Sequence, residues 1–133
     1  MNVSGILLVD DDSASIFIAR HALKKYNPQV TITSVSNGED ALRYIQESVP
    51  GEDPDAKTII LLDITMPVMN GFLFINRFNK LDETIKKRFK ILVYSSFVDI
   101  GILKDLLPLG ITGSIEKPLT EQKIKLYIDN DKI

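Results

Sequence analysis

Residues 58–71 read Thr-Ile-Ile-Leu-Leu-Asp-Ile-Thr-Met-Pro-Val-Met-Asn-Gly, and the first half of this stretch decides the fold class. A short, almost continuously apolar run is typical of a strand buried on both faces of a parallel sheet. The runs at 6–9 and 91–94 have the same character. The run at 30–35 is more polar and suits an edge strand, and 111–115 is the fifth run of the chain.

Segments with helical spacing separate these five runs. Apolar residues recur every three or four positions from 13 to 26 and again from 71 to 78. Residues 36–39 fit a capping box with Ser36 as the N-cap, and 98–107 predict a shorter helix that Pro108 and Gly110 stop. Thr120 can cap the last helix. Five strands alternating with five helices predict one α/β domain over residues 1–133, folded as a three-layer sandwich.

Composition excludes several classes of protein. A chain of 133 residues suits a single core, and the absence of cysteine excludes disulfides and thiolate metal sites. The net charge is -2, and the basic residues are scattered apart from a short run at 86–88, so no basic stripe predicts nucleic-acid binding. Neither a signal peptide nor an apolar run of about 20 residues is present. We therefore expect a cytoplasmic domain without membrane insertion.

The residues that follow the apolar runs are candidates for chemistry, because ligands bind at the carboxyl ends of strands in open α/β sheets. Asp10 and Asp11 follow the first run, Asp63 the third, Ser95 the fourth and Lys117 the fifth. Converging carboxylates repel one another unless a cation intervenes, and oxygen ligands without His or Cys suit Mg²⁺ or Mn²⁺. A carboxylate nucleophile, a divalent metal, a lysine and a hydroxyl donor together predict a site for a transferring phosphoryl group.

These residues resemble the response-regulator receiver family, the phosphoacceptor domains of two-component signalling, and in particular its single-domain, chemotaxis-regulator-like members. The matching pieces are Leu-Leu-Val-Asp-Asp at 7–11, Leu-Leu-Asp-Ile-Thr-Met-Pro-Val-Met-Asn-Gly at 61–71, Ser95, and Lys-Pro at 117–118. The resemblance implies a flavodoxin-like sheet with the strand order 2-1-3-4-5. It also implies a cis Lys117–Pro118 peptide bond.

The resemblance assigns a role to each candidate residue. Asp63 would be phosphorylated, Ser95 would hydrogen-bond a phosphoryl oxygen, and Lys117 would pair with Asp63 before transfer and with the phosphoryl group afterwards. The implied Mg²⁺ ligands are all oxygen donors: Asp10, Asp11, Asp63 and the backbone carbonyl of Thr65. The donor would be a histidine kinase, a histidine phosphotransfer protein or a small molecule such as acetyl phosphate.

The 16 residues after Lys117 provide one helix, so we expect no output domain, no DNA binding and no turnover of an external substrate. Signalling would then require an unknown downstream protein, bound through the last two helices and the fifth strand as in the family.

Simpler roles and rival functions stand beside this interpretation. Asp12 is best read as a helix cap, Ser96 is a rival to Ser95, and His21 is a partly exposed structural residue. One rival is a haloacid-dehalogenase-type phosphatase, but its motif needs a second acid where Thr65 stands. A second rival is a flavodoxin-like FMN binder, but the aspartates after the first run would repel the phosphate of that flavin nucleotide.

A phosphorylation-independent interaction module is the remaining alternative, because Ser114 stands where receivers often carry an aromatic. Asn70 replaces the acidic residue frequent before Gly71, and we expect little consequence. We also expect Phe97 to slow hydrolysis of the acyl phosphate by restricting water.

Overall fold

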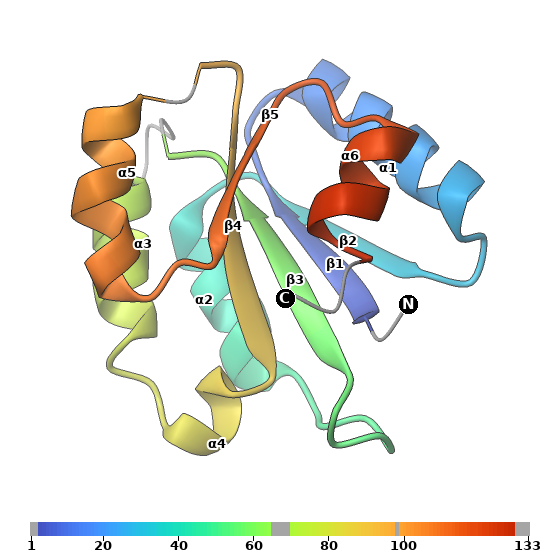
Figure 1. Cartoon of the computed structure of the whole chain (residues 1–133). Coiled ribbons are helices and arrows are strands. Elements are labelled where there is room, and N and C mark those ends of the chain that lie inside the picture. The colour runs from blue at the N-terminus through green and yellow to red at the C-terminus, as the bar shows by residue number, and fades with distance from the viewer. Residues whose placement is uncertain (1–2, 65–69, 98, 130–133) are drawn as a thin grey trace.

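The computed structural model describes residues 3–64, 70–97 and 99–129, and within them five strands form one sheet (Figure 1). Every strand pair is parallel, and the order is β2-β1-β3-β4-β5, as the family resemblance implied. The strands are β1 (Val3–Val9), β2 (Thr31–Val35), β3 (Lys57–Leu62), β4 (Phe89–Ser95) and β5 (Gly113–Glu116). The fifth begins two residues later than predicted, and Ile111 packs into the core ahead of it.

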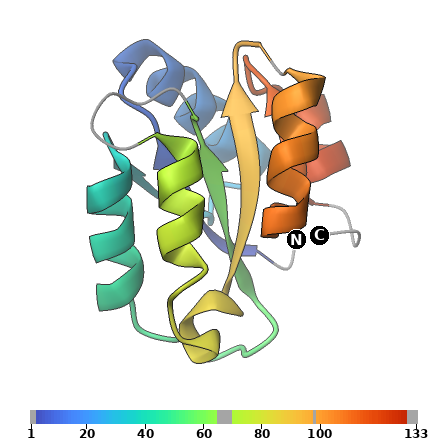
Figure 2. The ribbon, with the colours of Figure 1, turned by 90° about the vertical axis from the view of Figure 1, so that its left-hand side faces the viewer.

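Helices cover both faces of the sheet (Figures 1 and 2). On one face lie α1 (Ser13–Tyr26) and α6 (Glu121–Tyr127), and on the other lie α2 (Gly38–Glu47), α3 (Gly71–Phe78) and α5 (Ile100–Leu106). Each face has its own cluster of buried apolar side chains. Successive residues of a central strand enter opposite clusters, which explains why the apolar runs are continuous rather than alternating.

The structure has six α-helices in its described part, so the prediction of five was wrong. The additional helix, α4 (Glu83–Lys86), is a single turn before β4, and a 3₁₀ turn (Leu107–Leu109) follows α5. One turn is too short to show a helical apolar period, and the side chain of Asp82 makes no capping bond there. None of the helices in the described ranges combines the length and the apolar character that crossing a membrane requires.

Side chains cap most of the longer helices. Asp12 and Thr120 are the N-caps of α1 and α6, as predicted, and Gly110 ends the 3₁₀ turn with a φ of 101°. The cap of α2 is Asn37 rather than Ser36, because its Oδ1 accepts the backbone N–H of Asp40 at 2.8 Å. Asp99 caps α5, which therefore begins later than predicted, and residue 98 lies outside the described ranges.

Candidate functional site

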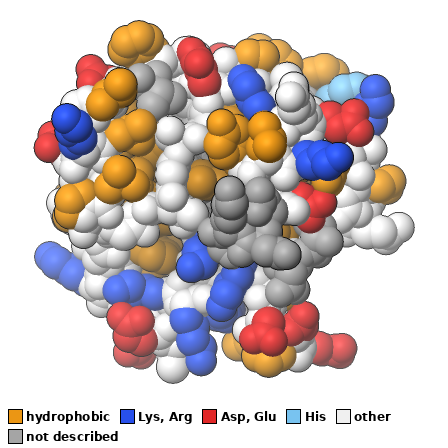
Figure 3. Space-filling view, in the orientation of Figure 1, with side chains coloured by type: hydrophobic (Ala, Val, Ile, Leu, Met, Phe, Trp, Pro, Cys, Tyr) orange, Lys and Arg blue, Asp and Glu red, His pale blue; other side chains and the backbone are white. Residues whose placement is uncertain are grey.

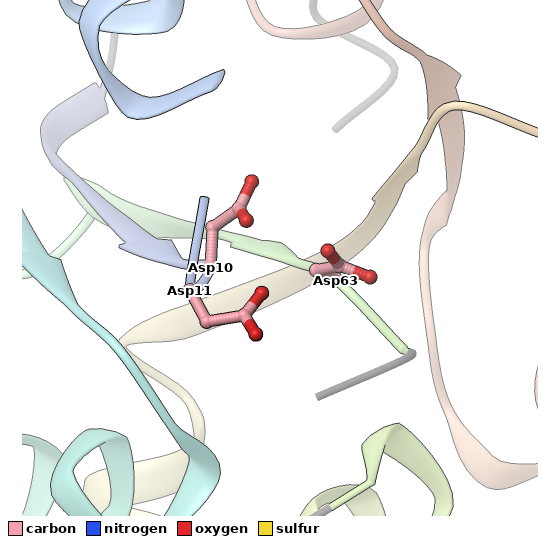
Figure 4. A group of neighbouring side chains, drawn as sticks. All are labelled: Asp10, Asp11 and Asp63. Atoms are coloured by element: carbon pink, nitrogen blue, oxygen red, sulfur yellow. The ribbon is translucent and has the colours of Figure 1, made fainter. Parts of the chain in front are cut away.

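The buried polar side chains among the described residues gather at the carboxyl end of the sheet. They are Asp10, Ser15, Asp63 and Ser95, each no more than 8% exposed. Asp10 and Asp63 follow β1 and β3, and backbone bonds of the parallel ladder hold both: Asp10 N donates to the carbonyl of Val35, and Asp63 N to that of Val9. The strands therefore fix two carboxylates side by side at one edge of the sheet (Figure 4).

Asp11 completes a group of three acids. Carboxylate oxygens of Asp10, Asp11 and Asp63 lie within 4.8 Å of one another, and the side chain of Asp11 is exposed (Figure 4). Octahedral Mg²⁺ binds oxygens at about 2.0–2.1 Å, so two of its ligands lie at most about 4.2 Å apart. The all-oxygen chemistry of these acids fits such an ion, and oxygens within 4.8 Å of one another need only small side-chain shifts to reach its ligand spacing. Thr65, the fourth predicted ligand, lies outside the described residues.

Lys117 contacts two of these acids. Its Nζ donates to Asp10 Oδ2 at 2.7 Å and to Asp63 Oδ2 at 3.4 Å. The Lys117 side chain is only 12% exposed. The backbone of Lys117 is held at the end of β4, because its N–H donates to the carbonyl of Ser95 at 2.7 Å. Partial burial lowers the pKa of Lys117, but the hydrogen bond and charge of Asp10, with those of Asp63, outweigh burial and raise the pKa above its ordinary value. The Lys117–Pro118 bond is cis, as the resemblance implied.

Asp10 is held by more than the lysine. Its Oδ1 accepts the backbone N–H of Asp12 at 2.9 Å, and its Oδ2 accepts the hydroxyl of Ser15 at 2.8 Å. A buried carboxylate is stabilised when its lone pairs are used in this way. Sequence reasoning missed Ser15, although a signal existed: Ser15, Ala19 and Leu23 follow one another at helical spacing and form the buried face of α1.

Ser95 lies at the site, but its hydroxyl faces its own loop. The Oγ donates to the carbonyl of Phe97 at 2.8 Å and accepts the Phe97 N–H at 3.3 Å. The Phe97 side chain is 74% exposed, and Ser96 is exposed as well. Ser114, on β5, is half-buried and pairs with Val93 of β4.

Gly71 shapes the segment that follows Asp63. A Cβ at this glycine would lie 2.8 Å from Ile64 Cα and 2.6 Å from Ile64 Cγ2, so the start of α3 touches the residue after Asp63 directly. The N–H of Gly71 also donates to the carbonyl of Ile64 at 3.2 Å. Only glycine permits this approach.

Comparison with known proteins tests the family resemblance independently of the site geometry. The family model for the response regulator receiver domain matches residues 6–129. The chain is similar to the 3',5'-cyclic-nucleotide phosphodiesterase regA of Dictyostelium discoideum, with 30% identity over 125 residues that cover 93% of this chain and 15% of that protein. It is 29% identical to the chemotaxis protein CheY of Treponema pallidum over 122 residues, which cover 90% of this chain and 76% of that protein.

A solved structure is similar over nearly its whole length. A two-component response regulator from Legionella pneumophila is 25% identical, with a TM-score of 0.76, and the match covers 92% of this chain and 94% of that one. The chain therefore spans a small part of the regA phosphodiesterase but most of the two shorter regulators.

Proposed function

Because the chain belongs to the response regulator receiver domain family, we propose that it accepts a phosphoryl group on Asp63 and signals through contact with another protein. The observation that carries the proposal is the position of Lys117, whose Nζ lies 2.7 Å from Asp10 and 3.4 Å from Asp63 at the carboxyl end of the sheet. A carboxylate becomes a usable nucleophile toward phosphate only where positive charge offsets the repulsion between the two anions.

Part of that charge would come from a divalent cation. Bound Mg²⁺, or Mn²⁺ in its place, would neutralise charge on the phosphoryl oxygens during transfer. Its proposed ligands are the carboxylates of Asp10, Asp11 and Asp63 and the backbone carbonyl of Thr65. Asp11 is the most accessible of the three acids, so it would be the first to meet the ion.

Lys117 and Ser95 would then rearrange around the phosphorylated Asp63. The ammonium group of Lys117 would move from the carboxylates to a phosphoryl oxygen. The Ser95 hydroxyl would rotate from the carbonyl of Phe97, its present acceptor at 2.8 Å, to another phosphoryl oxygen. Because Phe97 precedes Asp99, the cap of α5, loss of that bond would release the segment leading into α5.

The proposed phosphodonor is a histidine kinase or a histidine phosphotransfer protein, and the domain turns over no external substrate. The competing function is a phosphorylation-independent interaction module. Ser114 favours it, because a serine cannot supply the aromatic rotation by which many receivers report phosphorylation.

Intact-protein mass spectrometry after incubation with acetyl phosphate, with and without Mg²⁺, tests the proposal. We expect one phosphoryl adduct that requires Mg²⁺ and disappears in Asp63→Asn. Asp82→Asn is the matched control, because Asp82 lies before α4 and makes no side-chain capping bond. An adduct that persists in Asp63→Asn would contradict the assignment. If no adduct forms and beryllofluoride with Mg²⁺ leaves the NMR spectrum unchanged, the interaction module is the better description.

A further inference from the structure

A buried tyrosine directly behind the site contacts the lysine that the proposed transfer needs. Tyr94 precedes Ser95 on β4, and its side chain, 2% exposed, packs in the cluster beneath α1 and α6. Its hydroxyl oxygen accepts the backbone N–H of Leu119 at 3.0 Å. The Nζ of Lys117 lies 5.3 Å from the centroid of its ring. The Tyr94 side chain thus contacts both the ammonium group of Lys117 and the backbone of Leu119.

Ser15 lies beside the same tyrosine and contacts the acidic group. Ser15, Tyr94 and Lys117 line one hollow of the surface. Ser15 in turn donates to Asp10 Oδ2, the oxygen that Lys117 also contacts. Burial raises the pKa of the Tyr94 hydroxyl, and the Leu119 N–H and the charge of Lys117 only partly oppose it, so the phenol is neutral at pH 7.

We propose that Tyr94 is a positioning residue for Lys117 in phosphoryl transfer to Asp63, an inference that rests on the function proposed above. A lysine ammonium on a flexible four-carbon stem can turn away from the two carboxylates unless neighbouring groups restrict the stem. The ring face offers a second attractive surface for the cation in a site with little water. The hydroxyl accepts the N–H of Leu119, two residues after Lys117. This bond restrains the backbone at Lys117 and so the direction in which the lysine side chain enters the site.

Three variants separate positioning from simple stability. Tyr94→Leu removes the ring and the hydroxyl, whereas Tyr94→Phe removes the hydroxyl alone. Leu92→Val is the matched control, because Leu92 lies two residues earlier on β4, is 3% exposed and packs in the same cluster. Phosphorylation by acetyl phosphate should slow about fivefold in Tyr94→Leu and about twofold in Tyr94→Phe, and should not slow in Leu92→Val.

The affinity for Mg²⁺ without a phosphodonor discriminates further. A loosened Lys117 competes less for Asp10, so Tyr94→Leu should bind Mg²⁺ as tightly as the unaltered protein or more tightly. General damage to the site would weaken Mg²⁺ binding and slow Leu92→Val equally, and that result would overturn the proposal. In the background of Lys117→Met, Tyr94→Leu should add no further slowing, because interacting residues are not additive.

An NMR measurement tests the contact without any phosphorylation. A ring face beneath the ammonium should shift the Hε protons of Lys117 upfield, and Tyr94→Leu should abolish that shift while Tyr94→Phe keeps it. An unshifted Lys117 signal in the unaltered protein would sink the positioning role even if Asp63 is phosphorylated. A shifted signal in a protein that accepts no phosphoryl group would instead sink the proposed function, and the contact would stand.

Discussion

Lysines make bonds of equal length at the two ends of the β-sheet. At the amino end, Lys57 Nζ donates to the backbone carbonyl of Lys87 at 2.7 Å, and at the carboxyl end Lys117 Nζ donates to Asp10 Oδ2, also at 2.7 Å. The first bond is exposed and its acceptor is neutral, whereas the Asp10 side chain is 3% exposed and charged. The acceptor and its burial, not the length of the bond, determine what each lysine can do.

The surroundings of the two lysines differ in the same way. Basic side chains gather at the end of the molecule where α4 lies (Figure 3), and there Lys86 also donates to a backbone carbonyl, that of Asn79 at 3.2 Å. These lysines tie turns together, and the charge of Lys86 is paired with the exposed carboxylate of Glu83 at 3.2 Å. At the other end, three carboxylates approach one another, and Lys117 supplies charge that they require.

The largest expected difference comes from removing each lysine in turn. Lys117→Met should slow phosphorylation by acetyl phosphate about 100-fold, because the transferring phosphoryl group then lacks one preorganised positive charge beside it. Lys57→Met should leave the rate unchanged and should alter the free energy of unfolding by less than about 1 kcal/mol. Phosphorylation time courses and urea denaturation of both variants measure these effects. Equal rates in the two variants would abolish the distinction between the two ends.

Much of this contrast could be predicted from the sequence. Asp10, Asp63 and Lys117 each directly follow a run of strand residues, and parallel strands end at one edge, so their convergence followed from the pattern. Ser15 and Tyr94 were missed because their roles depend on tertiary contacts. A serine in the first turn of a helix and a tyrosine in a buried strand look like ordinary core positions until the elements are packed.

The details of the fold that escaped prediction were local ones. The choice between Ser36 and Asn37 as a cap depends on one residue of helix register, and both residue types are good caps. The orientation of the Ser95 hydroxyl toward Phe97 depends on a loop with no sequence signature. The prediction of a single domain without an output domain stays a prediction, as do the consequences of Ser114 and Phe97 for switching and for hydrolysis.

Glycines offer a second test of the two ends. Gly71→Ala should lower the free energy of unfolding by about 1–3 kcal/mol, because the added Cβ would meet the Ile64 backbone at 2.8 Å. The added Cβ would displace the Ile64 backbone, and this should also slow phosphorylation, since Ile64 directly follows Asp63 in the chain. Gly51→Ala, in the loop before β3, meets nothing within 4 Å and should be neutral or slightly stabilising. Thermal and urea denaturation of the pair decide the matter, and a Gly71→Ala protein as stable as Gly51→Ala would contradict the close packing.

The smallest expected effect concerns the exposed acid of the site. Asp11→Asn removes one of three repelling charges, so without Mg²⁺ it should raise the free energy of unfolding by about 0.5–1 kcal/mol. The same change removes a charged ligand, so Mg²⁺ should bind at least about tenfold more weakly, and stabilisation by saturating Mg²⁺ should shrink. Glu52 is also an exposed acid and lies in the loop before β3, so Glu52→Gln should change neither quantity. Asp11→Asn should therefore stabilise the protein without Mg²⁺ and reduce its stabilisation by Mg²⁺. An ordinary surface acid should show neither effect, because it neither repels the other two acids nor binds the ion. Urea denaturation at several Mg²⁺ concentrations measures both signs, and a parallel response of the two variants would remove Asp11 from the site.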